Sequence, residues 1–264
     1  MENEFNVVVS CRDGEFIANK NDIYVGRSLI KYGEFSYQEM VLFKALCEPS
    51  DVIIEAGANI GAHTVGLAKL VGLEGRVVAI EPQATLYQNL CGNISINSLT
   101  NVDCLNLALS NEAGTALVPH FNYVEENNYG GVAMGSNEAG YEVQQMRLDD
   151  LFRFPKLKFL KIDVEGMEKK VLEGAENIIK QFSPVMYIEN DRLDRSKDLI
   201  EHLFSLDYDL WWHITPLFNE NNFNGDTENI YLGVSSVNML CIHASAKAKI
   251  DLPKIEDSGQ HPVN

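Results

Sequence analysis

Blocks of apolar and polar residues alternate along the chain and predict strands and helices in turn. Three aliphatic residues follow Asp51, glycines at positions 57 and 61 turn the backbone, and an apolar helical pattern begins soon after. The following blocks repeat this order. The predicted sequence is strand, helix, strand, helix, strand over residues 52–54, 65–73, 76–81, 86–97 and 101–109. This alternation favours a parallel sheet with helices on both faces.

The second half of the chain continues the pattern after an irregular stretch. Residues 115–147 suggest two strands joined by a long, polar and glycine-rich excursion. Later apolar runs predict four more strands, the first two of them ending in carboxylates, over residues 156–163, 185–189, 208–214 and 237–243.

The pattern divides the chain into three parts. A hairpin turning at Asp13 and Gly14, with a helix over residues 34–47, forms a cap made of residues 1–50. Residues 51–246 form the main domain. Residues 247–264 form a C-terminal tail, and its polar last part, from Asp251, is expected to be frayed.

Composition and charge exclude several classes of function. The 264 residues are 45% hydrophobic, which suffices for one large core, and a net charge of −17 disfavours binding to nucleic acid. Five scattered cysteines suggest neither a disulfide framework nor a zinc site. No apolar run has the length of a membrane span or the form of a leader, so we expect a cytoplasmic protein with no membrane partner. No pattern indicates an oligomeric state.

The glycine loop is the first candidate binding site. Gly57 and Gly61 let the main chain approach a ligand, and the N–H groups of the following helix favour an anion. Glu55 precedes the first glycine and a third glycine is missing, which differs from the dinucleotide-binding pattern. A carboxylate there suits the cationic amine of S-adenosylmethionine, and Glu81 at the next strand tip suits a ribose diol. The alternative is an ordinary tight turn with a solvated strand end.

Carboxylates at the tips of later strands form the second candidate site. Asp163 and Glu165 end one strand, and their tip should lie beside the first strand, where ligands bind in open α/β sheets. The alternative is that they cap the helix that follows. Asp163, with Glu189 and Asn190 on the neighbouring strand, also offers hard oxygen ligands to Mg²⁺; acidic strand tips without a metal are the alternative.

Several of these motifs resemble those of FkbM-type methyltransferases, a branch of the class I S-adenosylmethionine-dependent enzymes. The resemblance extends from about residue 36 to about residue 243, and its motifs lie at residues 55–64, 81–82, 148–150, 161–168 and 174–175. It implies a Rossmann-like fold with a seven-stranded sheet whose last strand is antiparallel. Together with the residue pattern, we expect an α/β fold of this kind with a mostly parallel sheet, helices on both faces, an N-terminal hairpin and inserted loops. The resemblance also implies O-methylation of a hydroxyl, commonly on a sugar or a natural product. The predicted metal ligands resemble those of catechol-type O-methyltransferases.

The resemblance implies cofactor contacts as well. They fall on Glu55, Gly57, Asn59, Gly61, Thr64 and Glu81. Position alone adds Asp163, at the reactive side of the cofactor, and Ser110, at the strand tip where an adenine would lie. His63 departs from the small or aromatic residue expected at its position, and its role is open.

Methyl transfer to a hydroxyl requires alignment of the reacting atoms and a base. Asp163, Glu165 and His213 are the candidate bases, although His213 stands beside two tryptophans and is better explained as a core or rim histidine. Substrate contacts are expected from side chains where aromatics and amides interleave or lie near strand tips: Trp212, His213, Asn190 and Asn238. A hydrophobic cluster beneath solvated amides is the alternative.

Two other functions remain alternatives to a small-molecule or glycan O-methyltransferase. A nucleotide-binding oxidoreductase that uses NAD would use the same sheet, but Glu55 and the missing glycine disfavour it. A non-catalytic protein that binds S-adenosylmethionine is the other, and the acidic strand tips argue against it.

Overall fold

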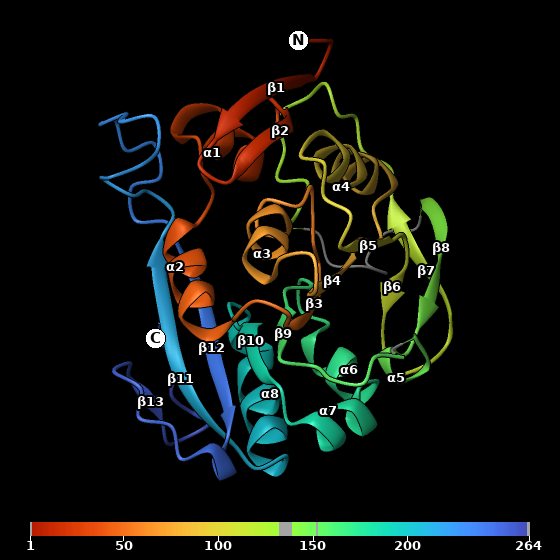
Figure 1. The fold of residues 1–264 in the computed structure, drawn as a ribbon, viewed down its shortest axis with the longest axis vertical. Coiled ribbons are helices and arrows are strands. Elements are labelled where there is room, and N and C mark those ends of the chain that lie inside the picture. Colours follow the sequence, from red (N-terminus) through yellow and green to blue (C-terminus); the bar gives the residue numbers. More distant parts are fainter. Residues whose placement is uncertain (1, 132–138, 152, 263–264) are drawn as a thin grey trace.

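The computed structural model describes residues 2–131, 139–151 and 153–262, and its centre is an eight-stranded sheet (Figure 1). The strand order is β13-β11-β12-β10-β9-β3-β4-β5. Their bounds are β3 (Val52–Ala56), β4 (Arg76–Ile80), β5 (Val102–Leu105), β9 (Phe159–Ile162), β10 (Val185–Glu189), β11 (Tyr208–Pro216), β12 (Ser235–His243) and β13 (Lys254–Ile255).

Five adjacent strands, from β5 to β10, run parallel. β12 is antiparallel to both β10 and β11, between which it lies. The α/β class, the mostly parallel sheet and its antiparallel last long strand are therefore confirmed. The short strand β13 adds an eighth strand to the seven that were expected.

Helices cover both faces of the sheet. They are α1 (Val25–Tyr32), α2 (Tyr37–Leu46), α3 (Thr64–Val71), α4 (Ala84–Ile96), α5 (Leu148–Leu151), α6 (Glu168–Glu173), α7 (Glu176–Phe182) and α8 (Leu193–Ser205), with a short 3₁₀ turn at Ala244–Ala246. Because side chains of a strand alternate between faces, Ile54 packs with α6, α7 and α8, while Ile53 packs with α2 and α3. Among the described residues, no helix is long and apolar enough to cross a membrane.

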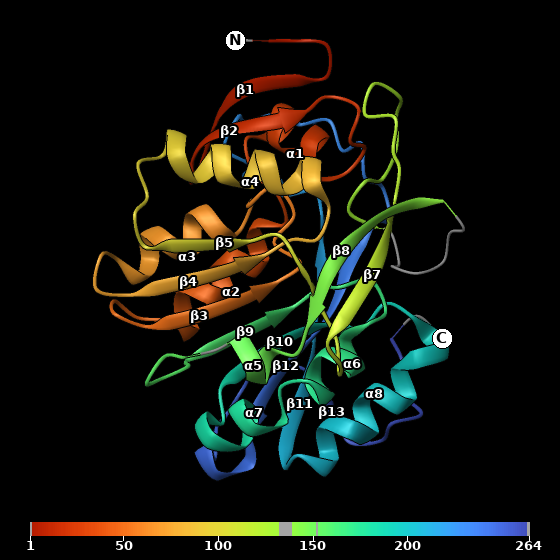
Figure 2. The same ribbon diagram turned by 90° about the vertical axis from the view of Figure 1, so that its right-hand side faces the viewer.

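The N-terminal part forms the predicted hairpin. β1 (Asn6–Cys11) and β2 (Gly14–Asn19) pair antiparallel around the turn at Asp13 and Gly14. The hairpin lies against α4 (Figure 2), where the Ile17 N–H donates to Asn93 Oδ1 at 2.6 Å. The cap is thus fixed to the main domain by buried amides as well as by apolar contacts.

The predicted strand over residues 101–109 is two strands that belong to different sheets. β5 ends at Leu105, and β6 (Ala108–Leu109) joins β8 (Gly140–Met146) and β7 (Gly114–Pro119) in a small three-stranded sheet. The chain turns between them at Asn106, whose Nδ2 donates to the Glu81 and Pro82 carbonyls. The two strands predicted within residues 115–147 are confirmed as β7 and β8. Part of the predicted excursion between them, residues 132–138, lies outside the described residues.

The expectation of a frayed C-terminal tail was wrong for its described part. β13 pairs with β11, and its Ile255 is only 1% exposed. Further along, His261 packs edge-on against Trp212, and its Nε2 lies 2.9 Å from the Asn190 carbonyl oxygen. A two-residue strand is too short to show a periodic pattern, and the polar residues around Ile255 give no sign that its side chain is buried.

This packing predicts a measurable cost for Ile255→Ala. Removal of a fully buried Ile side chain should lower the free energy of unfolding by about 2–4 kcal/mol in urea denaturation. Leu73→Ala is the matched control, because Leu73 is 81% exposed and its loss should change stability by less than about 0.5 kcal/mol. An Ile255→Ala protein as stable as the parent would show that the tail does not pack.

Candidate active site

Two pockets join at the carboxyl ends of β3, β4, β9 and β10. The larger is a polar cleft, and the smaller is mostly apolar. Both are lined by the same five residues, which form their boundary: Gly57, Glu81, Gly130, Asp163 and Glu165. A ligand with one flat apolar end and one charged end would fit across this boundary.

The apolar pocket lies between the main sheet and the small sheet. Its walls include aliphatic side chains from both sheets and from the loop after β9, among them Ile80, Leu107, Leu109, Val164 and Met167. Such walls suit a flat aromatic ring. Ser110, which was expected here, does not line the pocket, and its hydroxyl lies 3.3 Å from Asn111 Oδ1. The residues just before it take the place assigned to it.

The glycine loop brings the β3 tip against the β9 tip. Gly57 has φ +82°, and a Cβ there would lie 1.7 Å from the Asp163 carbonyl oxygen. Only glycine fits, because both the backbone conformation and the contact exclude a side chain. Asn59 follows with φ 52°, and its N–H donates to Glu81 at 2.9 Å. The glycine loop is therefore joined to the acidic tips of two neighbouring strands.

Glu81 is buried at the boundary between the two pockets. Each of its oxygens accepts one backbone N–H, from Asn59 at 2.9 Å and from Gln83 at 2.8 Å. Burial raises the pKa of Glu81 to about 7. A carboxylate oxygen has two lone pairs, so each oxygen keeps one for a ligand hydroxyl. This is the geometry that a ribose diol requires.

Glu55 lies in the floor of the cleft. It is 1% exposed, and Thr64 Oγ1 donates to its Oε2 at 2.6 Å. Burial raises its pKa to about 7. Thr64 does not line the cleft and acts on it through Glu55, while Gly61 lies behind the loop against Leu90. Both residues thus support the predicted cofactor site from behind it.

The buried cation of the site, Lys161, was not identified as a functional residue from the sequence. It is 3% exposed, its Nζ lies 2.9 Å from Asp163 Oδ2 and 4.0 Å from Glu55 Oε1, and it pairs with Glu55 in the β3–β9 register. Burial disfavours its charge, but Asp163, Glu55 and Glu39 outweigh this and raise its pKa. For Asp163, burial raises the pKa, but the charge of Lys161 outweighs burial, and the pKa of Asp163 is lowered. Its position two residues before Asp163, hence on the same face, was the available signal.

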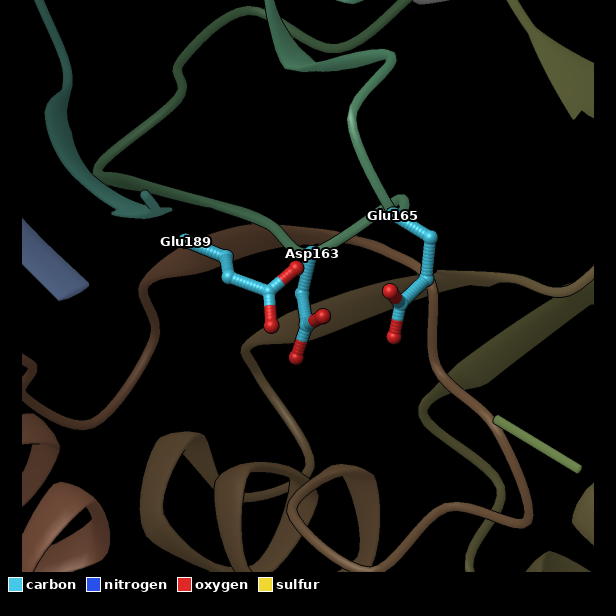
Figure 3. Close-up of side chains that lie close together, drawn as sticks. All are labelled: Asp163, Glu165 and Glu189. Carbon is cyan, nitrogen blue, oxygen red and sulfur yellow. The ribbon is translucent and has the colours of Figure 1, made fainter. Parts of the chain in front are cut away.

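Three carboxylates form a cluster at the open side of this floor (Figure 3). One oxygen each from Asp163, Glu165 and Glu189 lies within 4.8 Å of the others. Arg192 donates to Glu165, which has φ 56°. Glu189 Oε2 is buried and has no hydrogen-bond partner among the described residues. Burial, followed by the charges of Asp163 and Glu165, raises the pKa of Glu189 well above its usual value.

The predicted metal set is corrected by this geometry. Asn190 is not part of the cluster: its side chain is buried, and its Nδ2 lies 3.2 Å from Met239 Sδ. Consecutive residues of a strand point to opposite faces, so Glu189 and Asn190 cannot both face the cleft. Glu165, from the loop after β9, is the third member of the cluster instead, beside Asp163 and Glu189.

Three further predicted residues lie outside the cleft lining. His213 on β11 places its Nδ1 2.8 Å from the Tyr187 hydroxyl, and Asn238 on β12 donates to Glu39 Oε1 at 3.3 Å. Trp212 is 7% exposed and packs on His261 in the core. None of the three lines the cleft, so none is placed to act on a ligand there. His213 and Trp212 lie on β11, an outer strand that β12 and β10 separate from the site. Asn238 lies on β12 opposite Glu189, but its amide is held by Glu39.

The structure gives His63 a position that the sequence left open. It lines the cleft, is 4% exposed, and packs edge-on against Phe43 with ring centres 5.6 Å apart. Burial lowers its pKa to about 3, so the ring is neutral at physiological pH. Tyr24 and Phe35 add aromatic walls on the same side of the cleft.

Comparison with known proteins gives one family and several solved structures. The model of the FkbM methyltransferase domain family matches residues 55–210, more than half of the chain. Methyltransferase sdnD from Sordaria araneosa is 28% identical in a region that covers 47% of this chain and 60% of that protein. The chain thus spans less than two thirds of this relative.

Two solved structures have a similar fold, each with a TM-score of 0.51. One is the FkbM methyltransferase from Methylobacillus flagellatus, with 18% identity over 74% of this chain and 44% of that chain. The other is the precorrin-6y C5,15-methyltransferase from Geobacter metallireducens, with 14% identity over 86% of this chain and 93% of that chain. At these identities they show the fold, a Rossmann-like methyltransferase architecture.

The ion pairs in the floor predict a pH-dependent effect of Lys161→Met. Loss of the cation leaves two buried carboxylates uncompensated and should lower the free energy of unfolding by about 3–5 kcal/mol at neutral pH. The pKa of Asp163 then rises above its unfolded value, so the folded protein binds extra protons as the pH falls. The difference in the free energy of unfolding between Lys161→Met and the parent should therefore become smaller as the pH is lowered to about 5, as measured by urea denaturation at several pH values. Lys158→Met, at an exposed lysine just before β9, is the control. A deficit that is independent of pH would contradict this account.

Proposed function

Because the chain belongs to the family of FkbM methyltransferase domains, we propose that it transfers a methyl group from S-adenosylmethionine to a hydroxyl of a small polar molecule. The observation that carries this proposal is the pair of joined pockets, one apolar and one charged, that share Gly57, Glu81 and Asp163 at the strand tips. The apolar lining of one pocket and the polar lining of the other suit the two ends of that cofactor.

Each part of the cofactor has a complementary wall. The adenine fits the apolar pocket, the ribose diol fits the free lone pairs of Glu81, and the cationic methionine end fits the loop at Gly57 above Glu55. When bound, S-adenosylmethionine supplies an activated methyl group on a sulfonium. The protein then has to align the acceptor oxygen with it and take up the hydroxyl proton.

Asp163 is our proposed base. It lines both pockets, and Lys161 keeps it ionised at neutral pH. Burial raises the pKa of Glu165 to about 7, and its carboxylate is held by Arg192, so Glu165 is better suited to orient the acceptor. Positioning is expected to contribute more than proton removal, since the sulfonium is already reactive.

The acceptor is proposed to be a sugar or another polyhydroxylated small molecule, free or within a glycan. Hydroxyl groups suit the carboxylates and aromatic side chains that line the cleft, among them Glu165, Glu189, Asp191 and Tyr24. The net charge of −17 disfavours a nucleic acid as the acceptor.

Magnesium does not fit the donor set as well as the sequence suggested. Asn190 faces away, Asp163 already pairs with Lys161, and Glu165 with Arg192. A divalent ion would lie close to two fixed positive charges. Proton removal is therefore assigned to Asp163 without a metal ion.

Calorimetry tests the cofactor assignment. The protein should bind S-adenosylmethionine and S-adenosylhomocysteine but not NAD, and Glu81→Ala should weaken this binding by about 1–3 kcal/mol, because charged hydrogen bonds to the ribose are lost. Glu74→Ala, which removes an exposed carboxylate before β4, should leave affinity unchanged. Binding of NAD in preference would favour an oxidoreductase instead.

Turnover tests the role of Asp163. Release of S-adenosylhomocysteine, measured on a panel of sugars and nucleotide sugars, should fall about 10²–10⁴-fold in Asp163→Asn with cofactor affinity largely kept. Lys158→Met serves again as a control for general effects. Full activity in Asp163→Asn would remove it as the base, and cofactor binding without turnover of any acceptor would favour the non-catalytic alternative.

A further inference from the structure

The acceptor side of the cleft has more negative than positive charge. Lys161 is shared between Asp163 and Glu55, at 2.9 and 4.0 Å, and Arg192 is shared between Glu165 and Asp191. The buried Oε2 of Glu189 has no hydrogen-bond partner among the described residues. Lys161 and Arg192 therefore serve a cleft that is lined by six carboxylates: Glu55, Glu81, Asp163, Glu165, Glu189 and Asp191. Three of these, Asp163, Glu165 and Glu189, form the cluster.

The cluster faces the cleft, and one of its oxygens lacks a hydrogen-bond partner among the described residues. Its three carboxylates lie side by side, from the tip of β10 and from the loop after β9 (Figure 3). Glu189 Oε2 is buried without a partner, and so is Nε2 of His63, which is 96% buried in the wall of the same cleft. Unpaired buried polar atoms are costly, so a site lined by them is completed by a ligand with hydrogen-bonding groups.

We propose, on the basis of the function proposed above, that the acceptor carries a protonated primary amine that binds between Asp163, Glu165 and Glu189. The acceptor class is then an amino sugar, an aminocyclitol or a similar amino alcohol. Its ammonium group donates one hydrogen bond to each carboxylate, including the unpaired oxygen of Glu189.

The spacing admits an ammonium group. The three oxygens lie within 4.8 Å of one another, so a nitrogen between them can lie within about 2.8 Å of all three, the length of a charge-assisted N–H···O bond. This upper limit also admits the shorter bonds of Mg²⁺, but Lys161 and Arg192, which pair with two of the three carboxylates, disfavour a divalent ion. The charge also favours a cation: Lys161 and Arg192 are shared with Glu55 and Asp191, so a further positive group at the cluster is stabilised by its carboxylates.

The position of the amine has a chemical consequence. A nitrogen that donates three hydrogen bonds to carboxylates stays protonated and has no lone pair, so it cannot attack the sulfonium carbon. The methyl group goes instead to a hydroxyl near the ammonium, whose proton passes to Asp163. The amine thus serves recognition, and the product is an O-methylated amine.

Paired ligands test the proposal. The full chain, saturated with S-adenosylhomocysteine, is titrated with glucosamine, N-acetylglucosamine, glucose and MgCl₂ in a calorimeter. Glucosamine should bind about tenfold or more tightly than its two neutral analogues, since loss of the positive charge removes charge-assisted bonds to three carboxylates. Glu189→Gln should abolish this preference while binding of S-adenosylhomocysteine shows that the variant is folded.

Glu112→Gln is the matched control, because this exposed carboxylate lies in the turn before β7. Its preference for glucosamine should equal that of the parent. Equal binding of charged and neutral sugars, or no binding of glucosamine, would overturn the proposal while leaving cofactor-dependent methyl transfer intact. Binding of Mg²⁺ that Glu189→Gln abolishes would overturn it in favour of a metal. Failure to bind S-adenosylhomocysteine would instead contradict the proposed function itself.

Discussion

The site depends on one buried ion pair, between Lys161 and Asp163. Lys161 stands in the floor of the cleft, where burial alone would neutralise it, and three carboxylates keep it charged. In return it keeps Asp163 ionised among other acids. The parallel register of β3 and β9 places Glu55 opposite Lys161, so the sheet itself fixes this charge arrangement. The acidic strand tips are tolerated because this cation lies beneath them.

Much of the fold followed from the sequence because strong patterns encode it. Buried aliphatic runs bounded by glycines predicted the parallel strands, and strand tips of one sheet necessarily meet at one edge. That geometric rule predicts that Glu55, Gly57, Glu81, Asp163 and Glu165 lie together, and all five line the cleft. The same rule cannot tell which face a neighbouring residue takes, and so Asn190 was placed in a site that it does not line.

The sequence does not show which residue each polar side chain contacts in the folded protein. Lys161 is an unremarkable lysine in a strand until the register shows Glu55 beside it. His213 and Asn238 are polar residues near strand tips, yet Tyr187 and Glu39 occupy them within the protein. The small strand β13 depends on an edge of β11 that exists only after the sheet has formed. Long-range contacts of this kind leave no local signature.

The close contact between Gly57 and the Asp163 carbonyl joins the loop after β3 to the loop after β9. Since no side chain can enter between them, the loop of the proposed cofactor site and the loop that carries the proposed base keep a fixed separation. The aromatic and serine-rich walls contributed by Tyr24, Phe35 and residues 235–237 are not part of that contact. Diversity among relatives should therefore accumulate on those walls, so that new acceptors can be accommodated on an unchanged chemical core.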